Sequence, residues 1–132
     1  MENYGHWENE CGEPLENIGF IYRITNLTTN RKYIGKKLLQ FKTTKKPLKN
    51  RKNKRRGVKE SDWKTYTGSC NQLNEDIEKI GKQDFKFEIL CWCKNKSELS
   101  YNEMKHIIMS NALFDADYYN EYVGGRVRIR KG

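Results

Sequence analysis

Gly19-Phe20-Ile21-Tyr22-Arg23-Ile24-Thr25 is the first of two segments that together predict the central sheet, and Lys32-Tyr33-Ile34-Gly35 is the second. Both are rich in β-branched and aromatic residues, which favour strands. Residues 26–31 between them contain asparagines and threonines, which are typical of turns. The sequence therefore predicts a β-hairpin that places Tyr22 and Tyr33 as neighbours on one sheet.

Further along the chain, periodicity predicts two helices and one more strand. Ser69 and Gln72 have the spacing of a capping box, which predicts a helix over 69–81 that stops at a glycine. Apolar residues alternate over 85–91 and indicate a strand with one buried face. Ser97 or Ser100 then begins a helix that runs to about Ser110. The expected fold class is α+β, with about three antiparallel strands flanked by helices.

The composition indicates one basic domain. The chain has 132 residues, of which 26 are lysine or arginine and 17 are aspartate or glutamate, for a net charge of +9. Such a field attracts polyanions, nucleic acid first. No apolar run reaches the ~20 residues that span a bilayer, and the acidic N-terminus lacks a signal-peptide core. We expect a cytoplasmic protein that does not bind membranes.

Charge is distributed unevenly and suggests the domain boundaries. Residues 1–18 contain five glutamates and neither lysine nor arginine, so we expect an acidic N-terminal arm, which could lie across the cationic surface of its own molecule. Residues 36–57 form a stretch rich in lysine and arginine without an acid, which predicts a solvated loop, with a short helix as an alternative. The folded domain is expected over 19–124 and a basic tail over 125–132.

The four cysteines do not have the spacing of a zinc site. Cys91-Trp92-Cys93 leaves one residue too few between the sulfurs, while Cys11 and Cys70 stand alone. We expect free, partly buried thiols.

The two hairpin halves resemble the signature of the GIY-YIG nuclease family. Tyr33-Ile34-Gly35 matches the second half, whereas Phe20 stands where the family has its first glycine. The likeness extends over residues 19–124 and is strongest with the phage-encoded branch, some members of which are related to homing endonucleases. It rests on a series of elements in the same order: Trp63, Tyr66, Gly68-Ser69, the helix ending at Lys79-Ile80-Gly81, the strand 85–90, a helix with Glu103, and Asn120 at the end of an aromatic stretch.

The resemblance implies a metal-dependent endonuclease that hydrolyses phosphodiester bonds of double-stranded DNA with Mg²⁺ or Mn²⁺. It implies that Tyr22 deprotonates or orients the attacking water, Tyr33 gives a supporting hydrogen bond, and Asn120 belongs to the catalytic set. A phenol has a pKa of ~10. We therefore expect Lys36 and Lys37 to lower the pKa of the tyrosine that acts as the base.

Glu103 is the expected metal ligand. On a helical wheel it lies between Leu99 and Ile107, so it shares an apolar stripe, where a carboxylate is costly without a cation nearby. A hard dication such as Mg²⁺ often takes one carboxylate and several waters. The alternative is a capping box formed by Ser100 and Glu103.

The cation that binds the scissile phosphate is left open by the sequence. Relatives place an arginine about ten residues beyond the second tyrosine, and Thr43 stands there in this chain. Lys37 is the first candidate, with Arg51, Arg55 and Arg56 as alternatives. A histidine of some relatives has no counterpart here, and Tyr66 is a possible substitute.

The basic residues predict the DNA interface, and the alternative is a charged loop that binds nothing. The expected contacts with DNA are Lys36, Lys45, Lys46, Arg51, Lys54, Arg55, Arg56, Arg126, Arg128 and Arg130. The arginines of the tail could equally be the charged edge of a sheet. The chain has no room for a separate recognition domain, so we expect a loose specificity or one supplied by the basic loop, a dimer or a partner protein. The expected state is a monomer or a DNA-induced dimer.

Two other functions remain open at this point. The altered first half of the signature and the absent arginine are also compatible with a non-catalytic nucleic-acid-binding module. A protein-interaction domain is the third hypothesis. If the chain is phage-encoded, its location is the host cytoplasm.

Overall fold

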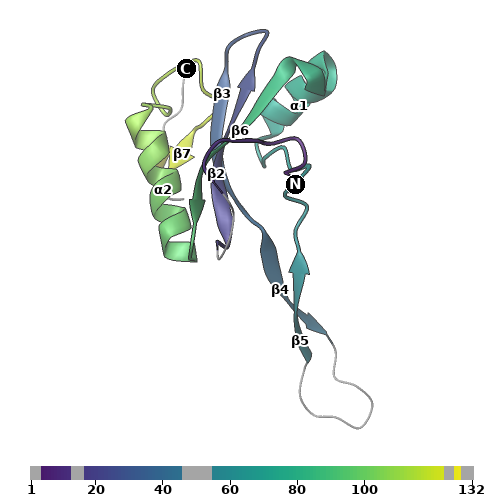
Figure 1. Cartoon of the computed structure of the whole chain (residues 1–132). Helices are drawn as coiled ribbons and strands as arrows, with labels where there is room; N and C mark the ends of the chain where they lie inside the picture. Colours follow the sequence, from purple (N-terminus) through teal and green to yellow (C-terminus); the bar gives the residue numbers. More distant parts are fainter. Residues whose placement is uncertain (1–3, 13–16, 46–54, 124–126, 129–132) are drawn as a thin grey trace.

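The computed structural model describes residues 4–12, 17–45, 55–123 and 127–128 (Figure 1). Its main sheet has four strands in the order β1-β6-β2-β3. These strands are β1 (Glu8–Asn9), β2 (Gly19–Asn26), β3 (Lys32–Leu38) and β6 (Phe85–Cys93). Strand β2 pairs antiparallel with both β3 and β6, while β1 is parallel to β6. The predicted α+β class is confirmed, with a short fourth strand beyond the three expected.

The predicted hairpin is formed by β2 and β3. Its turn is held by the side-chain oxygen of Asn26, which accepts hydrogen bonds from the amides of Thr28 (3.0 Å) and Thr29 (3.3 Å). In the register of the pair, Tyr22 lies opposite Gly35 and Ile24 lies opposite Tyr33. Because side chains alternate along a strand, both tyrosines are on the same face of the sheet.

Each face of the sheet is covered by one helix (Figure 1). Helix α1 (Asn71–Ile80) covers the aromatic face, whose core includes Trp7, Phe20, Trp63 and Phe87. Helix α2 (Lys96–Met109) covers the other face through an aliphatic core that includes Ile21, Ile34, Leu99 and Ile107. The tyrosines belong to the aromatic face, whereas Glu103 comes from the helix on the opposite side.

Both helices begin at other residues than the sequence predicts. The residue before α1 is Cys70, with no side-chain cap, so the capping role of Ser69 is wrong, although the helix does stop at Gly81. Helix α2 is capped by Asn95, whose side chain accepts from the amide of Glu98 at 2.8 Å. Neither Ser97 nor Ser100 caps it. The capping-box alternative for Glu103 is therefore wrong, because Ser100 lies inside the helix.

The described residues of the acidic segment are part of the domain. Trp7 is 4% exposed, and its indole nitrogen donates to the carbonyl of Trp63. Glu8 and Asn9 form β1 along β6. The strand order places β1 and β3 at opposite edges of the sheet. The expected boundary at residue 18 is therefore not seen in the packing, and Glu8 and Asn9 do not lie across the basic strand β3.

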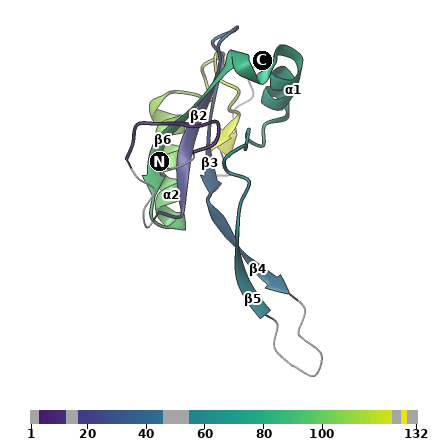
Figure 2. The same cartoon turned by 45° about the vertical axis from the view of Figure 1, so that its right-hand side comes forward.

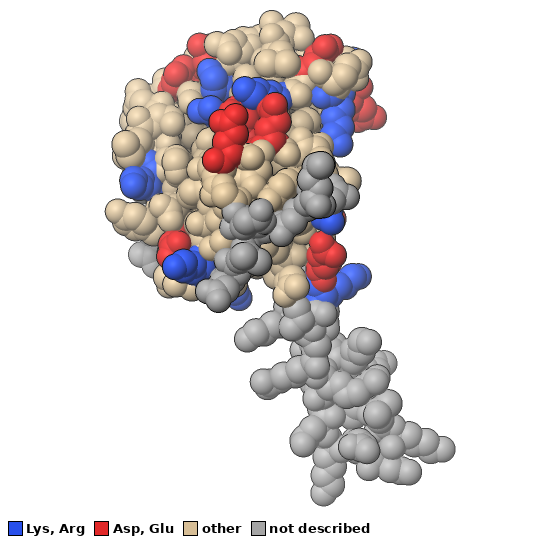
Figure 3. All heavy atoms as spheres, viewed as in Figure 1, with Lys and Arg blue, Asp and Glu red and all other residues tan. Residues whose placement is uncertain are grey.

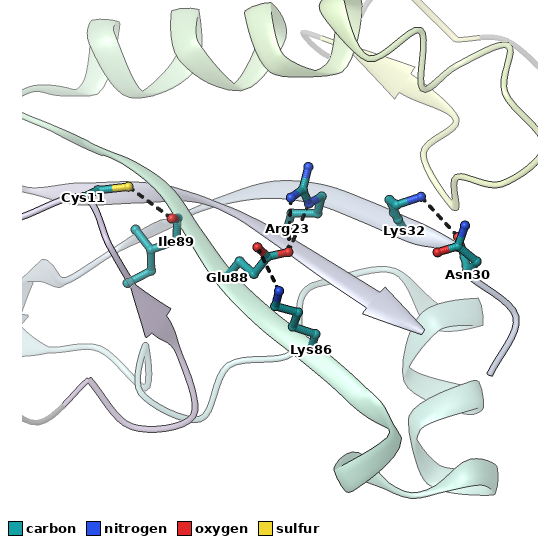
Figure 4. A network of polar contacts seen from close by, with 7 residues as sticks. All are labelled: Cys11, Arg23, Asn30, Lys32, Lys86, Glu88 and Ile89. Atoms are coloured by element: carbon teal, nitrogen blue, oxygen red, sulfur yellow. Dashed lines mark hydrogen bonds and ion pairs between the residues drawn. The ribbon is translucent and has the colours of Figure 1, made fainter. Parts of the chain in front are cut away.

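Polar contacts fix these strands to one another (Figure 4). Arg23 on β2 forms an ion pair with Glu88 on β6, with 3.2 Å between NH2 and Oε1, and Lys86 lies 3.6 Å from the other carboxylate oxygen. The thiol of Cys11 donates to the carbonyl of Ile89 at 3.3 Å. All four cysteines are free, as expected.

The basic segment forms a two-stranded ribbon at its ends instead of a loop. Strands β4 (Gln40–Lys45) and β5 (Arg55–Glu60) pair antiparallel and project away from the main sheet (Figures 1 and 2). At its base the amide of Leu39 donates to Ile18, and the amide of Ser61 donates to Leu39, both at 2.8 Å. The loop expectation failed here because ribbon pairing uses backbone groups and needs no apolar face.

The remaining elements are short. A 3-10 helix spans Lys82–Asp84, and β7 (Tyr122–Val123) pairs with β8 (Val127–Arg128) as a separate ribbon. Five of the residues expected to contact DNA lie outside the described part: Lys46, Arg51, Lys54, Arg126 and Arg130. Within the part described, every helix is too short or too polar to cross a bilayer.

Candidate active site

The hydroxyl of Tyr22 lies over Gly35, at the point where β3 forms the edge of the sheet. A Cβ atom added to Gly35 would be 2.4 Å from this oxygen, and one added to Gly68 would be 3.1 Å from it. Tyr22 is 1% exposed, and its ring packs 5.0 Å from that of Trp7. The hydroxyl therefore fits only because the two residues beside it have no side chain.

Two further phenols surround Tyr22. The ring centroid of Tyr33 is 6.2 Å away and that of Tyr66 is 6.1 Å away. Tyr33 is half-buried and borders a hollow of about 310 Å³ on the side of α1, next to Ser69 and Asn120. The structure thus brings together both signature tyrosines and Tyr66, the residue considered as a substitute for the histidine of relatives.

Glu103 reaches the same edge of β3 from α2. Its half-buried carboxylate accepts a hydrogen bond from the main-chain amide of Lys36, which follows Gly35 directly. Burial raises the pKa of Glu103, and the positive charge of Lys36 opposes part of this rise. The negative charge of Glu103 in turn helps to raise the pKa of Tyr22, so the two groups act on each other.

Asn120 binds the same edge of β3 at Ile34, two residues before Lys36. Its side-chain oxygen accepts from the amide of Ile34 at 3.0 Å, and its side-chain nitrogen donates to the carbonyl of Ile34 at 2.8 Å. The side chain is 4% exposed. Asn120 was expected among the catalytic residues, but this geometry makes it a positioning residue that holds the Tyr-Ile-Gly strand in place.

The two lysines after the signature do not lower the pKa of Tyr22. The ammonium of Lys37 is 2.8 Å from a carboxylate oxygen of Asp62 and 3.9 Å above the ring of Tyr66. That of Lys36 donates to the hydroxyl of Ser100 at 3.1 Å. The pKa of Tyr22 is raised, first by burial and then by its phenol and carboxylate neighbours. The expected lowering is wrong, and Tyr22 is a neutral phenol near pH 7.

Sequence reasoning assigned no role in this site to three residues that shape it. Gly68 adopts a φ of +86°, and its Gly-Ser dipeptide is the kind of turn signal that could have identified it. Asp62 and Ser100 hold the two lysine side chains, and nothing local in the sequence marks either residue.

The donor set fits a hard divalent cation held by one protein ligand. Among the residues that the structure describes, no three histidine, cysteine, aspartate or glutamate side chains form a cluster able to hold a metal. Glu103 is a single carboxylate whose burial is costly when it is ionised. Mg²⁺ suits such a place, because it keeps several waters and accepts substrate oxygens as further ligands.

The domain is thus an α+β fold with a mixed sheet and one helix on each face, and phenols, a carboxylate and lysines gather at one edge of that sheet. Residues 6–123 match the family model described as "Putative endonuclease segE, GIY-YIG domain". The chain belongs to this GIY-YIG family. No curated protein and no solved structure gave a match.

Proposed function

We propose that this protein is a metal-dependent endonuclease that hydrolyses phosphodiester bonds in double-stranded DNA. The observation that carries the proposal is the meeting of two groups at the outer edge of β3. The hydroxyl of Tyr22 lies over Gly35, and the carboxylate of Glu103 binds the amide of the next residue, Lys36. They come from opposite faces of the sheet, so a substrate bound at this edge would lie between them.

The tyrosines orient the attacking water and the phosphate. The water oxygen attacks phosphorus, the bond to the 3′ oxygen breaks, and the products are a 5′-phosphate and a 3′-hydroxyl. One proton leaves the water and one reaches the 3′ oxygen, so the balance needs no other reactant. Tyr22, as a neutral phenol, donates to a phosphate oxygen and accepts from the water. Tyr33, beside the open hollow, gives the supporting hydrogen bond.

Glu103 would hold the Mg²⁺ or Mn²⁺ ion. When bound, the ion supplies positive charge that stabilises the leaving oxygen. The amide of Lys36 helps to hold the carboxylate of Glu103 at this edge. Asn120 holds Ile34, and therefore the strand that carries Tyr33 and Lys36.

Lys37 is the cation proposed for the scissile phosphate. It lies on the tyrosine face of β3 and already holds one anionic oxygen, that of Asp62, at 2.8 Å. Asp62 is exposed, with 69% of its side chain accessible, so a phosphate can share or replace this contact. Arg55 and Arg56 remain alternatives from strand β5, and Arg51 lies outside the described residues.

The β4–β5 ribbon is the proposed DNA-binding element. Its strands contain Lys45, Arg55 and Arg56. A two-stranded ribbon fits the major groove of B-DNA, which is about 12 Å wide. Charges of both signs are mixed on the face of the body seen in Figure 3, so that face offers no broad basic surface. Lys36 and Arg128 are further contacts in the proposal. The protein acts as a monomer or DNA-induced dimer in the cytoplasm, that of the host if it is phage-encoded.

A nicking assay on supercoiled plasmid tests the proposal. The protein is expected to convert the plasmid to open-circle and linear forms with Mg²⁺ or Mn²⁺, and to stop in EDTA. Glu103→Gln should remove this activity. Glu78→Gln, which changes an exposed glutamate on α1, is the matched control and should retain it. Full activity of Glu103→Gln would contradict the metal-ligand role.

A non-catalytic nucleic-acid-binding module is the second candidate. Two observations favour it: Phe20 replaces the first glycine of the signature, and Tyr22 is buried with a raised pKa. DNA binding without cleavage in either metal would establish this candidate instead.

A further inference from the structure

A second hollow lies at the same edge of the sheet, between the catalytic groups and the base of the ribbon. It has a volume of about 390 Å³. Lys36 and Lys37 on β3 form one wall, Lys96 and Ser100 on α2 form the other, and Ser61 lies where the ribbon joins the body. Two leucines line the rest of the hollow.

Its polar groups are suited to an anion. Three lysines and two serines line it, and no aspartate or glutamate is among the lining residues. Lys36 and Lys96 form no ion pair with any residue that the structure describes, and Lys37 has one with the exposed Asp62. The site therefore has an excess of positive charge, which a bound phosphate would neutralise.

Two side chains in the hollow are arranged in a way that favours a ligand there. The ammonium of Lys36 is fixed by the hydroxyl of Ser100 at 3.1 Å, so it is held over the hollow. Lys96 is the first residue of α2. A cation is unfavourable at this end because the helix dipole is positive there, and a bound anion would relieve that repulsion.

The hollow is next to the proposed catalytic groups: it shares Lys37 with them, whereas Tyr22 and Glu103 do not line it. Side chains alternate on β3, so Lys36 and Leu38 face α2 while Gly35 and Lys37 face Tyr22. Along β3 the hollow begins at Lys36 and extends to Leu38, which is about 10 Å from Gly35. A phosphate in the hollow would therefore belong to a neighbouring nucleotide and not to the bond that is cut.

We propose that Lys36, Lys96, Ser61 and Ser100 form a subsite for a DNA backbone phosphate that flanks the scissile one on the ribbon side. It rests on the proposed function, and it fixes the position of the strand along β3. Ser61 ties this subsite to the ribbon, because its amide binds Leu39 and its hydroxyl binds Leu38. Groove binding by the ribbon would thus set which phosphate reaches Tyr22 and Glu103.

The salt dependence of DNA binding tests the subsite. Affinity for a short duplex is measured by fluorescence anisotropy in EDTA at several salt concentrations. Lys96→Ala should lower the slope of log K against log salt by about 0.9, which is about 8-fold in affinity at about 0.1 M salt. Ser100→Ala should weaken binding less. Lys105→Ala is the matched control, because Lys105 is exposed on the same helix and does not line the hollow.

Inorganic phosphate provides a test that does not need DNA. Titration followed by NMR should shift the amides of Ser61 and Ser100 in the unmodified protein, and these shifts should disappear in Lys96→Ala. Equal behaviour of Lys96→Ala and Lys105→Ala, or no shift with phosphate, would overturn the subsite. Failure of plasmid nicking alongside a positive phosphate titration would overturn only the nuclease proposal.

Discussion

Replacing Gly35 with alanine should disturb Tyr22 directly. The added Cβ would be 2.4 Å from the hydroxyl oxygen and 2.5 Å from Cζ, so the end of the ring must move by about 1 Å to restore ordinary contact. Tyr22 is 1% exposed and has little free space to move into. Overpacking of this kind costs about 1–3 kcal/mol, which corresponds to a fall in Tm of about 5–10 °C for a domain of this size.

The effect on activity should exceed the effect on stability. A displacement of about 1 Å in a positioning group can lower a rate by about 100-fold. Thermal melts and the plasmid nicking assay measure the two effects on the same protein. Gly35→Ala with wild-type Tm and wild-type nicking would show that the Tyr22 hydroxyl does not lie over this glycine.

A double-mutant cycle separates this contact from a general defect. Tyr22→Phe removes the oxygen that would clash, so its effect on stability and that of Gly35→Ala should be non-additive by about 0.5 kcal/mol or more. The clash with Cζ remains, so the rescue is partial. Tyr33→Phe is the matched control, and its effect should add to that of Gly35→Ala.

Four further outcomes are expected. Burial raises the pKa of Glu103, so the fold favours the protonated carboxyl. The stability gained from this preference is present below about pH 4.5 and is lost as the pH rises through the raised pKa. Glu103→Gln should therefore melt higher at pH 7, and Mg²⁺ should raise the Tm of the wild type but not of this variant. Tyr22→Phe and Tyr33→Phe should each lower the nicking rate by orders of magnitude with little change in Tm. If Tyr22 is nevertheless the base, the rate should keep rising with pH beyond about 10, whereas a plateau near pH 8 would exclude it. Burial and the charge of Lys82 lower the pKa of His6 to about 4, so stability should fall as pH drops from about 6.5 to about 4. For this half-buried ring the loss is about 1–2 kcal/mol after allowance for screening, and denaturant titrations should show it disappear in His6→Phe.

Much of the fold could be predicted from local patterns in the sequence. The hairpin followed from two β-branched and aromatic segments around a polar turn, and Glu103 was found because it interrupts the stripe of Leu99 and Ile107. The helix starts were not predicted correctly, because several residues that can cap stand close together and only the folded chain selects Asn95. The burial of Trp7 was not predicted, because its neighbours in the sequence are acidic and its partner Trp63 lies far along the chain.

The candidate site was less predictable than the fold. The signature identified Tyr22 and Tyr33, but the protonation state of Tyr22 depends on its burial, to which residues far apart in the sequence such as Trp7 and Gly68 contribute. Neighbouring side chains on a strand lie on opposite faces, so the lysines that follow the signature have different partners. Lys36 binds Ser100 and Lys37 binds Asp62. A basic stretch without apolar periodicity gave no sign of the β4–β5 pairing, because the backbone alone supplies those hydrogen bonds.

The side chains at the outer edge of β3 affect both the proposed reaction and the tendency of the protein to aggregate. An exposed edge strand has unpaired amides and carbonyls that can pair with another protein chain, so it can act as a template for aggregation. Here Asn120 and Glu103 already occupy the amides of Ile34 and Lys36. The groups that prepare this edge for a substrate therefore also keep it from recruiting a second molecule of the protein. A variant such as Asn120→Ala would lose the contact to Ile34 while Glu103 still binds the amide of Lys36, and its loss of function would come with self-association.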